Sequence, residues 1–192
     1  SEVADHVDKI YQAIITAGTY KAPSIRVAEA SKVIENTQRD VNIALVNEFL
    51  QIFNNIGIDT NEVIKAAATK WNFMNLKPGL VGGHCISVDP YYLMHKSQDA
   101  GYVPDLIRSA REINASMPEY LVNNFINKLI SKKINPIDLD IALIGFSFKE
   151  DCPDIRNTKV YDVFQLLIKS GFNVTVYDPV VVVDEVFIEY GV

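Results

Sequence analysis

The sequence has little cysteine, no excess of basic residues and no long apolar run, and each lack excludes a class of protein. Cys85 and Cys152 are the only cysteines among 192 residues, too few for a disulfide framework, so we expect a reducing compartment. The net charge of -6 disfavours a nucleic-acid or acidic-membrane partner. The longest apolar runs, 141–146 and 180–183, have the length of strands and not of membrane spans. We also expect no signal peptide, and hence a soluble, cytoplasmic protein.

Apolar residues recur at helical spacing through most of the first 130 residues. The pattern predicts an amphipathic helix within residues 1–22, closed near Gly18, and a long helix over 24–53 capped by Ser24. Further helices are predicted over 60–69 with Thr60 as N-cap, over 91–100, and over 104–130 with an interruption or kink near Pro118.

The pattern changes after residue 135. Residues 140–145 predict a buried strand, residues 160–169 a helix and residues 173–177 a second strand. This is a parallel βαβ unit, so the fold class is a mainly α domain followed by a partial α/β domain of Rossmann type. A lone βαβ unit leaves both sheet edges and one face bare, so we expect the chain to be truncated at its C-terminal side.

Cys85 lies in a glycine turn, GGHCISVDP at residues 82–90. If Asp89 is the N-cap and Pro90 the first residue of a helix, Cys85 precedes a helix N-terminus, where the dipole favours a thiolate. If the helix begins at Cys85 instead, Cys85 and Asp89 share one face. The alternative to both is an inert, buried cysteine, because free cysteines are often buried.

The long helix carries two opposite faces. One face is an apolar stripe: Val27, Ile34, Val41, Leu45, Phe49, Ile52 and Ile56. Lys32 and Asn36 point the other way, one turn apart. An ordinary solvated face would explain them, but an ammonium and a carboxamide so spaced can also bracket a carbonyl oxygen that becomes negative. We therefore treat Lys32 and Asn36 as a candidate oxyanion site.

The loop after the first predicted strand contains a single glycine, Gly145, and so lacks a dinucleotide fingerprint. Loops in this position hold ligands in open α/β sheets, and Lys149 and Arg156 would flank a phosphate there. The alternative is that both are surface charges paired with Asp151 and Asp154. Asp178, after the second strand, stands where a ribose hydroxyl is often bound.

These motifs, in their order, resemble the UDP-glucose/GDP-mannose dehydrogenase family. The resemblance rests on AEASK at 28–32 with Asn36, on NE at 47–48, on PGLVGGHCISVDPYYL at 78–93, on REIN at 111–114, and on GFSFK at 145–149 with DIR at 154–156. It spans nearly the whole chain. The HCIxVDPYY form is similar to the branch that acts on UDP-N-acetylhexosamines.

The resemblance implies an oxidation of the C6 alcohol of a nucleotide sugar to the acid with two NAD+. Cys85 would capture the intermediate aldehyde as a thiohemiacetal, whose oxidation gives a thioester for water to cleave. Lys32 and Asn36 would hold the oxyanion and the attacking water, and Asp89 would activate that water or transfer a proton. Arg156 would lie near the cofactor. The implied substrate-binding residues are Lys70, Gly79, Gly82, Gly83 and Lys149. No metal ligand is implied.

The resemblance also implies a domain order and a homodimer. Residues 1–22 would be a remnant of an absent N-terminal NAD-binding domain, residues 23–117 the helical central domain, and residues 118–192 the start of the UDP-sugar-binding domain. The central helices would form the dimer, and the chain alone would not reduce NAD+.

Two other functions compete with this interpretation. One is a non-catalytic module for dimerisation and UDP-sugar binding. The other is a thiol hydrolase using Cys85 with His84, which the opposite directions of adjacent side chains disfavour. The sequence does not identify the sugar.

Overall fold

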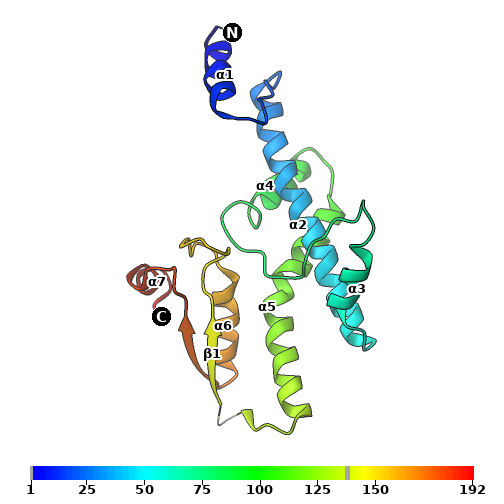
Figure 1. Ribbon diagram of the computed structural model, residues 1–192, viewed down its shortest axis with the longest axis vertical. Coiled ribbons are helices and arrows are strands. Elements are labelled where there is room, and N and C mark those ends of the chain that lie inside the picture. The colour runs from blue at the N-terminus through cyan, green and yellow to red at the C-terminus, as the bar shows by residue number, and fades with distance from the viewer. Residues whose placement is uncertain (1, 137–138) are drawn as a thin grey trace. The chain divides into compact units, whose positions relative to one another are not determined.

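The computed structural model describes residues 2–136 and 139–192 and contains seven helices and two strands within them (Figure 1). Residue 1, where the first predicted helix starts, lies outside these residues. By its contacts the chain divides into two units, one extending to Glu35 and the other running from Asn36 to Val192. The second unit holds most of the predicted site. No helix among the described residues is both long and apolar enough to cross a bilayer.

The first unit contains α1 (Glu2–Ile14) and the start of α2 (Ile25–Asn55). α1 ends four residues before Gly18, earlier than the glycine suggests. The connection folds back on α1, since Lys21 pairs with Asp5 and Thr19 donates a hydrogen bond to Asp8. Ser24 caps α2 by accepting a bond from the Val27 N–H, as predicted.

In the second unit α2 buries several polar residues, together with Ala44 and Val46, and exposes part of its apolar stripe. Asn36, Asp40 and Asn47 are buried, whereas Leu45 and Ile52 are exposed. A helix normally turns its apolar stripe inward. The buried polar residues mean that hydrogen bonds help to hold α2 to its neighbours here, while Leu45 and Ile52 of the apolar stripe face outward.

Helices α3, α4 and α5 follow α2. α3 (Thr60–Ala67) has Asp59 as its N-cap, with Asp59 accepting bonds from the Asn61 and Glu62 N–H groups; the prediction of Thr60 was wrong by one residue. α4 (Asp89–Asp99) and α5 (Asp105–Ser131) come next. α5 runs without interruption through the buried Pro118. Of the predicted interruption or kink, the interruption is therefore wrong and the kink stays a prediction.

The α/β part consists of β1 (Asp140–Ile144), α6 (Lys159–Lys169) and β2 (Asn173–Tyr177), with β1 and β2 parallel and Asp140 opposite Asn173. The predicted βαβ unit is confirmed, as is the fold class. Thr158 caps α6 through the Val160 N–H. One core joins α5 to this part and is made of Val122, Leu129, Leu167 and Phe172.

Two details of the α/β part differ from the prediction. β1 is not fully buried, because its alternate residues Ala142 and Ile144 are exposed on the outer face of the two-stranded sheet. The apolar run 180–183 leads into a helix, α7 (Val183–Tyr190), and not into a strand. α7 ends at Gly191 in the left-handed conformation, which glycine adopts without strain.

Candidate functional site

The Cys85 turn and the start of α4 are joined by backbone bonds. The Cys85 carbonyl accepts bonds from the N–H of Val88 at 3.0 Å and of Asp89 at 2.8 Å. α4 begins at Asp89 with Val88 as its N-cap and Pro90 in its first turn, so Asp89 is not the cap. The helix begins at Asp89, after a turn that closes on Cys85, an arrangement between the two predicted ones. The Cys85 thiol is half-buried.

Two of the predicted catalytic side chains meet at this turn. Asn36 on α2 donates a hydrogen bond from Nδ2 to Oδ2 of Asp89 at 2.6 Å. Asn36 is 2% exposed, and a bond from an amide to a carboxylate is stronger than one between neutral groups. The bond therefore joins two residues that are 53 positions apart in sequence. It fixes the Asp89 carboxylate, which follows Cys85 along the chain.

The glycines of the turn allow close contact with the loop after β1. A Cβ on Gly82 would lie 2.8 Å from the Asn157 carbonyl oxygen, and one on Gly83 would lie 2.9 Å from the Phe148 ring. Gly83 also has φ of +82° and donates its N–H to Asn157. A side chain at either position would push the turn away from the loop. The space beside Gly82 is therefore taken by the Asn157 backbone, and the space beside Gly83 by the Phe148 ring.

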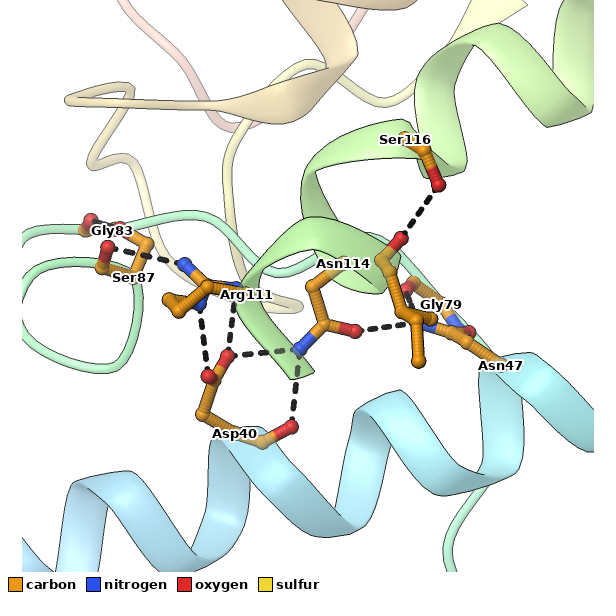
Figure 2. Close-up of polar contacts among 9 residues, drawn as sticks. Asp40, Asn47, Gly79, Gly83, Ser87, Arg111, Asn114 and Ser116 are labelled. Atoms are coloured by element: carbon orange, nitrogen blue, oxygen red, sulfur yellow. Dashed lines mark hydrogen bonds and ion pairs between the residues drawn. The ribbon is translucent and has the colours of Figure 1, made fainter. Parts of the chain in front are cut away.

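A buried ion pair connects α2 and α5 beneath the turn (Figure 2). Arg111 binds both carboxylate oxygens of Asp40, at 2.7 and 2.8 Å, and its Nη1 donates to the Ser87 carbonyl at 3.1 Å. Asp40 is 0% and Arg111 5% exposed. Burial raises the pKa of Asp40, and the Arg111 guanidinium and Asn114 amide oppose that rise. The pair thus ties the Cys85 turn to two helices.

The same buried cluster also binds Gly79, which precedes the Cys85 turn in the chain (Figure 2). Asn114 donates to Asp40 and accepts from Asn47 at 2.9 Å. Asn47 in turn donates to the Gly79 carbonyl at 3.0 Å and accepts from the Gly79 N–H at 2.8 Å. Gly79, predicted as a substrate residue, is therefore bound through its backbone by a buried amide.

Two charged residues of the loop after β1, Arg156 and Asp154, pair with each other. Arg156 binds Asp154 through two side-chain bonds, of 2.6 and 2.9 Å. The side-chain and backbone hydrogen bonds from Arg156 lower the pKa of Asp154 to about 2. The paired-charge alternative therefore holds for Arg156 with Asp154. His84 Nδ1 lies 3.8 Å from Asp154, and Lys149 is exposed.

Asp178 closes this loop from the end of β2. Its carboxylate accepts bonds from four backbone N–H groups, those of Phe146, Ser147, Val180 and Val181. Burial acts to raise the pKa of Asp178, but the four bonds together keep it below its ordinary value. Asp178 thus stabilises the loop, and the predicted ribose contact has no support in this arrangement.

Two further predicted residues are lysines. Lys32 belongs to the first unit, where its ammonium pairs with Glu35 at 3.0 Å, and its role beside Cys85 stays a prediction. Lys70 is exposed after α3, and its role also stays a prediction. The described residues contain no group of three or more His, Cys, Asp or Glu side chains that could hold a metal ion.

The sequence reasoning assigned no role to Arg111, Asn114 or Asn47. A signal was available, because Asn36, Asp40 and Asn47 recur on one face of the long helix at intervals of four and seven residues. An arginine with an acidic partner and paired asparagines is what a buried polar contact between helices requires.

Comparison with known proteins follows the two parts of the chain. Residues 26–116 match the central domain of the UDP-glucose/GDP-mannose dehydrogenase family, and residues 142–192 match its UDP binding domain. The whole chain is 54% identical to UDP-N-acetyl-D-glucosamine 6-dehydrogenase of Salmonella typhi over 192 residues, which are 45% of that protein. Protein CapL of Staphylococcus aureus is 54% identical over 177 residues, covering 92% of this chain and 42% of CapL.

A solved structure, the UDP-D-ManNAc dehydrogenase of Pyrococcus horikoshii, superposes with a TM-score of 0.81 at 32% identity. The match covers 95% of this chain and 43% of that protein. The chain thus spans less than half the length of the relatives that it matches. Its two matched segments, and relatives that agree with it along its whole length, show that the chain belongs to the UDP-glucose/GDP-mannose dehydrogenase family.

Proposed function

We propose that the chain is the central and UDP-sugar-binding part of an NAD-dependent 6-dehydrogenase that oxidises a UDP-N-acetylhexosamine to its uronic acid, a precursor of surface polysaccharide. The observation that carries the proposal is the Asn36–Asp89 hydrogen bond beside the Cys85 turn. It puts an amide and a carboxylate at the turn that carries the proposed nucleophile, Cys85. Relatives named as UDP-N-acetyl-D-glucosamine 6-dehydrogenases support the choice of substrate.

In the proposed reaction the Cys85 thiolate attacks the C6 aldehyde, forming a C–S bond while the carbonyl electrons move to oxygen. Asn36 and Lys32 would stabilise that oxyanion. Loss of a hydride from the thiohemiacetal leaves a thioester. Asp89 then accepts a proton from the water that attacks the thioester, and the acid and the free thiol are released. Fixed by Asn36, the Asp89 carboxylate is held ready for that step.

NAD+ would accept the hydrides, but the described residues do not fit a dinucleotide. The loop after β1 has a single glycine, and Asp178 is occupied by backbone amides. We therefore place the NAD+ site in a domain beyond these residues, in line with residues 1–22 as a remnant of it, 23–117 as the central domain and 118–192 as the start of the UDP-sugar domain. Arg156 stays a candidate cofactor residue, although Asp154 already binds it.

Substrate binding is proposed for the glycine segment and two lysines. Gly79, Gly82 and Gly83 would shape the backbone around the sugar, with Lys149 and Lys70 binding the diphosphate. The proposed homodimer would form through the outward apolar stripe of α2, where Leu45, Ile52 and Ile56 are exposed.

The decisive experiment is a panel of UDP-sugars offered to the enzyme that contains this chain together with its NAD+ domain. We expect two NADH per sugar with a UDP-N-acetylhexosamine, and no NADH from this chain alone. A yield of one NADH per sugar would contradict the four-electron scheme. Cys85→Ser should abolish turnover; if the wild-type enzyme gives no NADH and Cys85→Ser binds UDP-sugar unchanged, the chain is a non-catalytic binding module.

A further inference from the structure

The segment that carries Cys85 is held at both of its ends by one buried cluster. At residue 79, Asn47 forms two hydrogen bonds to the Gly79 backbone. At residue 87, Arg111 donates to the Ser87 carbonyl. Between these points lies the turn in which Ser87 donates its hydroxyl to the Gly83 carbonyl. Cys85 therefore lies in sequence between two anchored points. Figure 2 shows the two anchors, Asn47 of α2 at Gly79 and Arg111 of α5 at Ser87.

The two anchors are not independent of each other. Asn47 donates to Asn114, Asn114 donates to Asp40, and Asp40 binds Arg111. All of these side chains are buried. A buried polar group that loses its partner is costly, so a connected and fully bonded cluster strongly favours one geometry. A displacement at Gly79 must therefore disturb the contact at Ser87.

We propose that Arg111 and Asn47 are positioning residues for the Cys85 thiol, acting through the Ser87 and Gly79 backbones, with Asp40 and Asn114 linking the two. This deepens the proposed function, because it assumes that the nucleophile of that reaction is Cys85. Neither side chain takes part in the chemistry; each fixes where the sulfur stands relative to Asp89. Arg111 is suited to this because its planar fork reaches Asp40 and Ser87 together, which a lysine cannot do.

The test measures alkylation of Cys85 relative to Cys152 by iodoacetamide in the 192-residue chain, read by mass spectrometry under native conditions. Arg111→Lys keeps the charge and removes the bond to Ser87, and Asn47→Ala frees Gly79. Each should raise the Cys85 to Cys152 ratio about fivefold, because a released segment exposes the half-buried sulfur. The control, Val122→Ala, destabilises the α5–α6 core without touching the segment and should leave the ratio unchanged.

An unchanged ratio in both folded variants would overturn the proposal, as would an equal rise in Val122→Ala. If neither variant folds, amide hydrogen exchange of the unaltered chain decides. The proposal requires the bonded amides of the segment, those of Gly79, Gly83, Val88 and Asp89, to exchange far more slowly than those of a free loop. Exchange of these amides at the rate of a free loop would refute it. No readout involves NADH, so failure of the proposed dehydrogenase activity leaves this test intact.

Discussion

Two features of the structure favour glycine at position 83: its φ is positive, and the Phe148 ring leaves no room for a Cβ atom. Gly83→Ala should lower the free energy of unfolding by about 1–3 kcal/mol, because the methyl group adds strain and overlaps the ring. Gly79→Ala is the matched control, since a Cβ there meets nothing within 4 Å and both bonds to Asn47 are kept. Chemical denaturation of the two variants gives the comparison. Equal losses would mean that the close approach to Phe148 contributes nothing to stability.

Asp178 makes the stability of the α/β part depend on acid. Because its pKa is lowered in the folded chain, its contribution is complete above the unfolded value of about 4 and is lost as pH falls through the folded value. Asp178→Asn should cost about 1–3 kcal/mol at pH 7, since an amide cannot accept all four N–H bonds. The difference from wild type should shrink below about pH 4.

Urea unfolding measured across that pH range tests the sign. Glu150→Gln, at an exposed position of the loop that Asp178 binds, is the control and should track the wild type at every pH. A deficit in Asp178→Asn that stays constant down to pH 2 would show that the charge of Asp178 is not what the loop uses.

At the level of residues, the sequence predicted side chains that meet near the cysteine but not those that hold it. The turn motif marks Cys85 and Asp89, and helical spacing marks Asn36, so the Asn36–Asp89 contact follows from local patterns. Arg111 lies on another helix, 71 residues from Asp40. A partnership over that distance depends on how α2 and α5 pack, which no local spacing encodes.

Among the elements, α2 shows that the periodicity of a sequence identifies the two faces of a helix but does not say which face is buried. The apolar stripe was visible in the sequence, yet the polar face is the one that is buried in the second unit. A buried polar face is tolerated because Asp40, Asn47 and their partners bond one another. β1 and α7 depart from the prediction for a related reason. A short apolar run does not distinguish a strand from a helix, and it does not show whether a strand is buried on one face or on both.

The outward stripe of α2 carries a prediction about assembly. Ile52→Glu should weaken self-association by about tenfold or more, because a carboxylate would be buried against an apolar partner surface. The folded monomer should be unaffected, since Ile52 is already exposed. Sedimentation measurements over a range of concentrations report the change.

The control for this variant is Ile130→Glu, an equally exposed apolar position at the end of α5. It should associate like the wild type. Equal dissociation of both variants, or of neither, would remove α2 from the proposed interface.

On the scale of the whole molecule, the fold class and the βαβ unit were predictable because each rests on strong local periodicity along the chain. The arrangement of α2 against α5 was not predictable, because it depends on a few polar contacts between distant helices. The second unit therefore contains two kinds of junction. α2 joins α5 through an ion pair and amides, whereas α5 joins α6 through the apolar core of Val122, Leu129, Leu167 and Phe172.

Cooling changes the stability of these two junctions by different amounts. Apolar burial loses strength as water cools, while directional bonds between buried groups do not share that loss. Near freezing, the apolar contact between α5 and α6 would weaken before the polar contact between α2 and α5 does. The Cys85 turn would then keep its bonds to α2 and α5 while the α/β part loosens from α5.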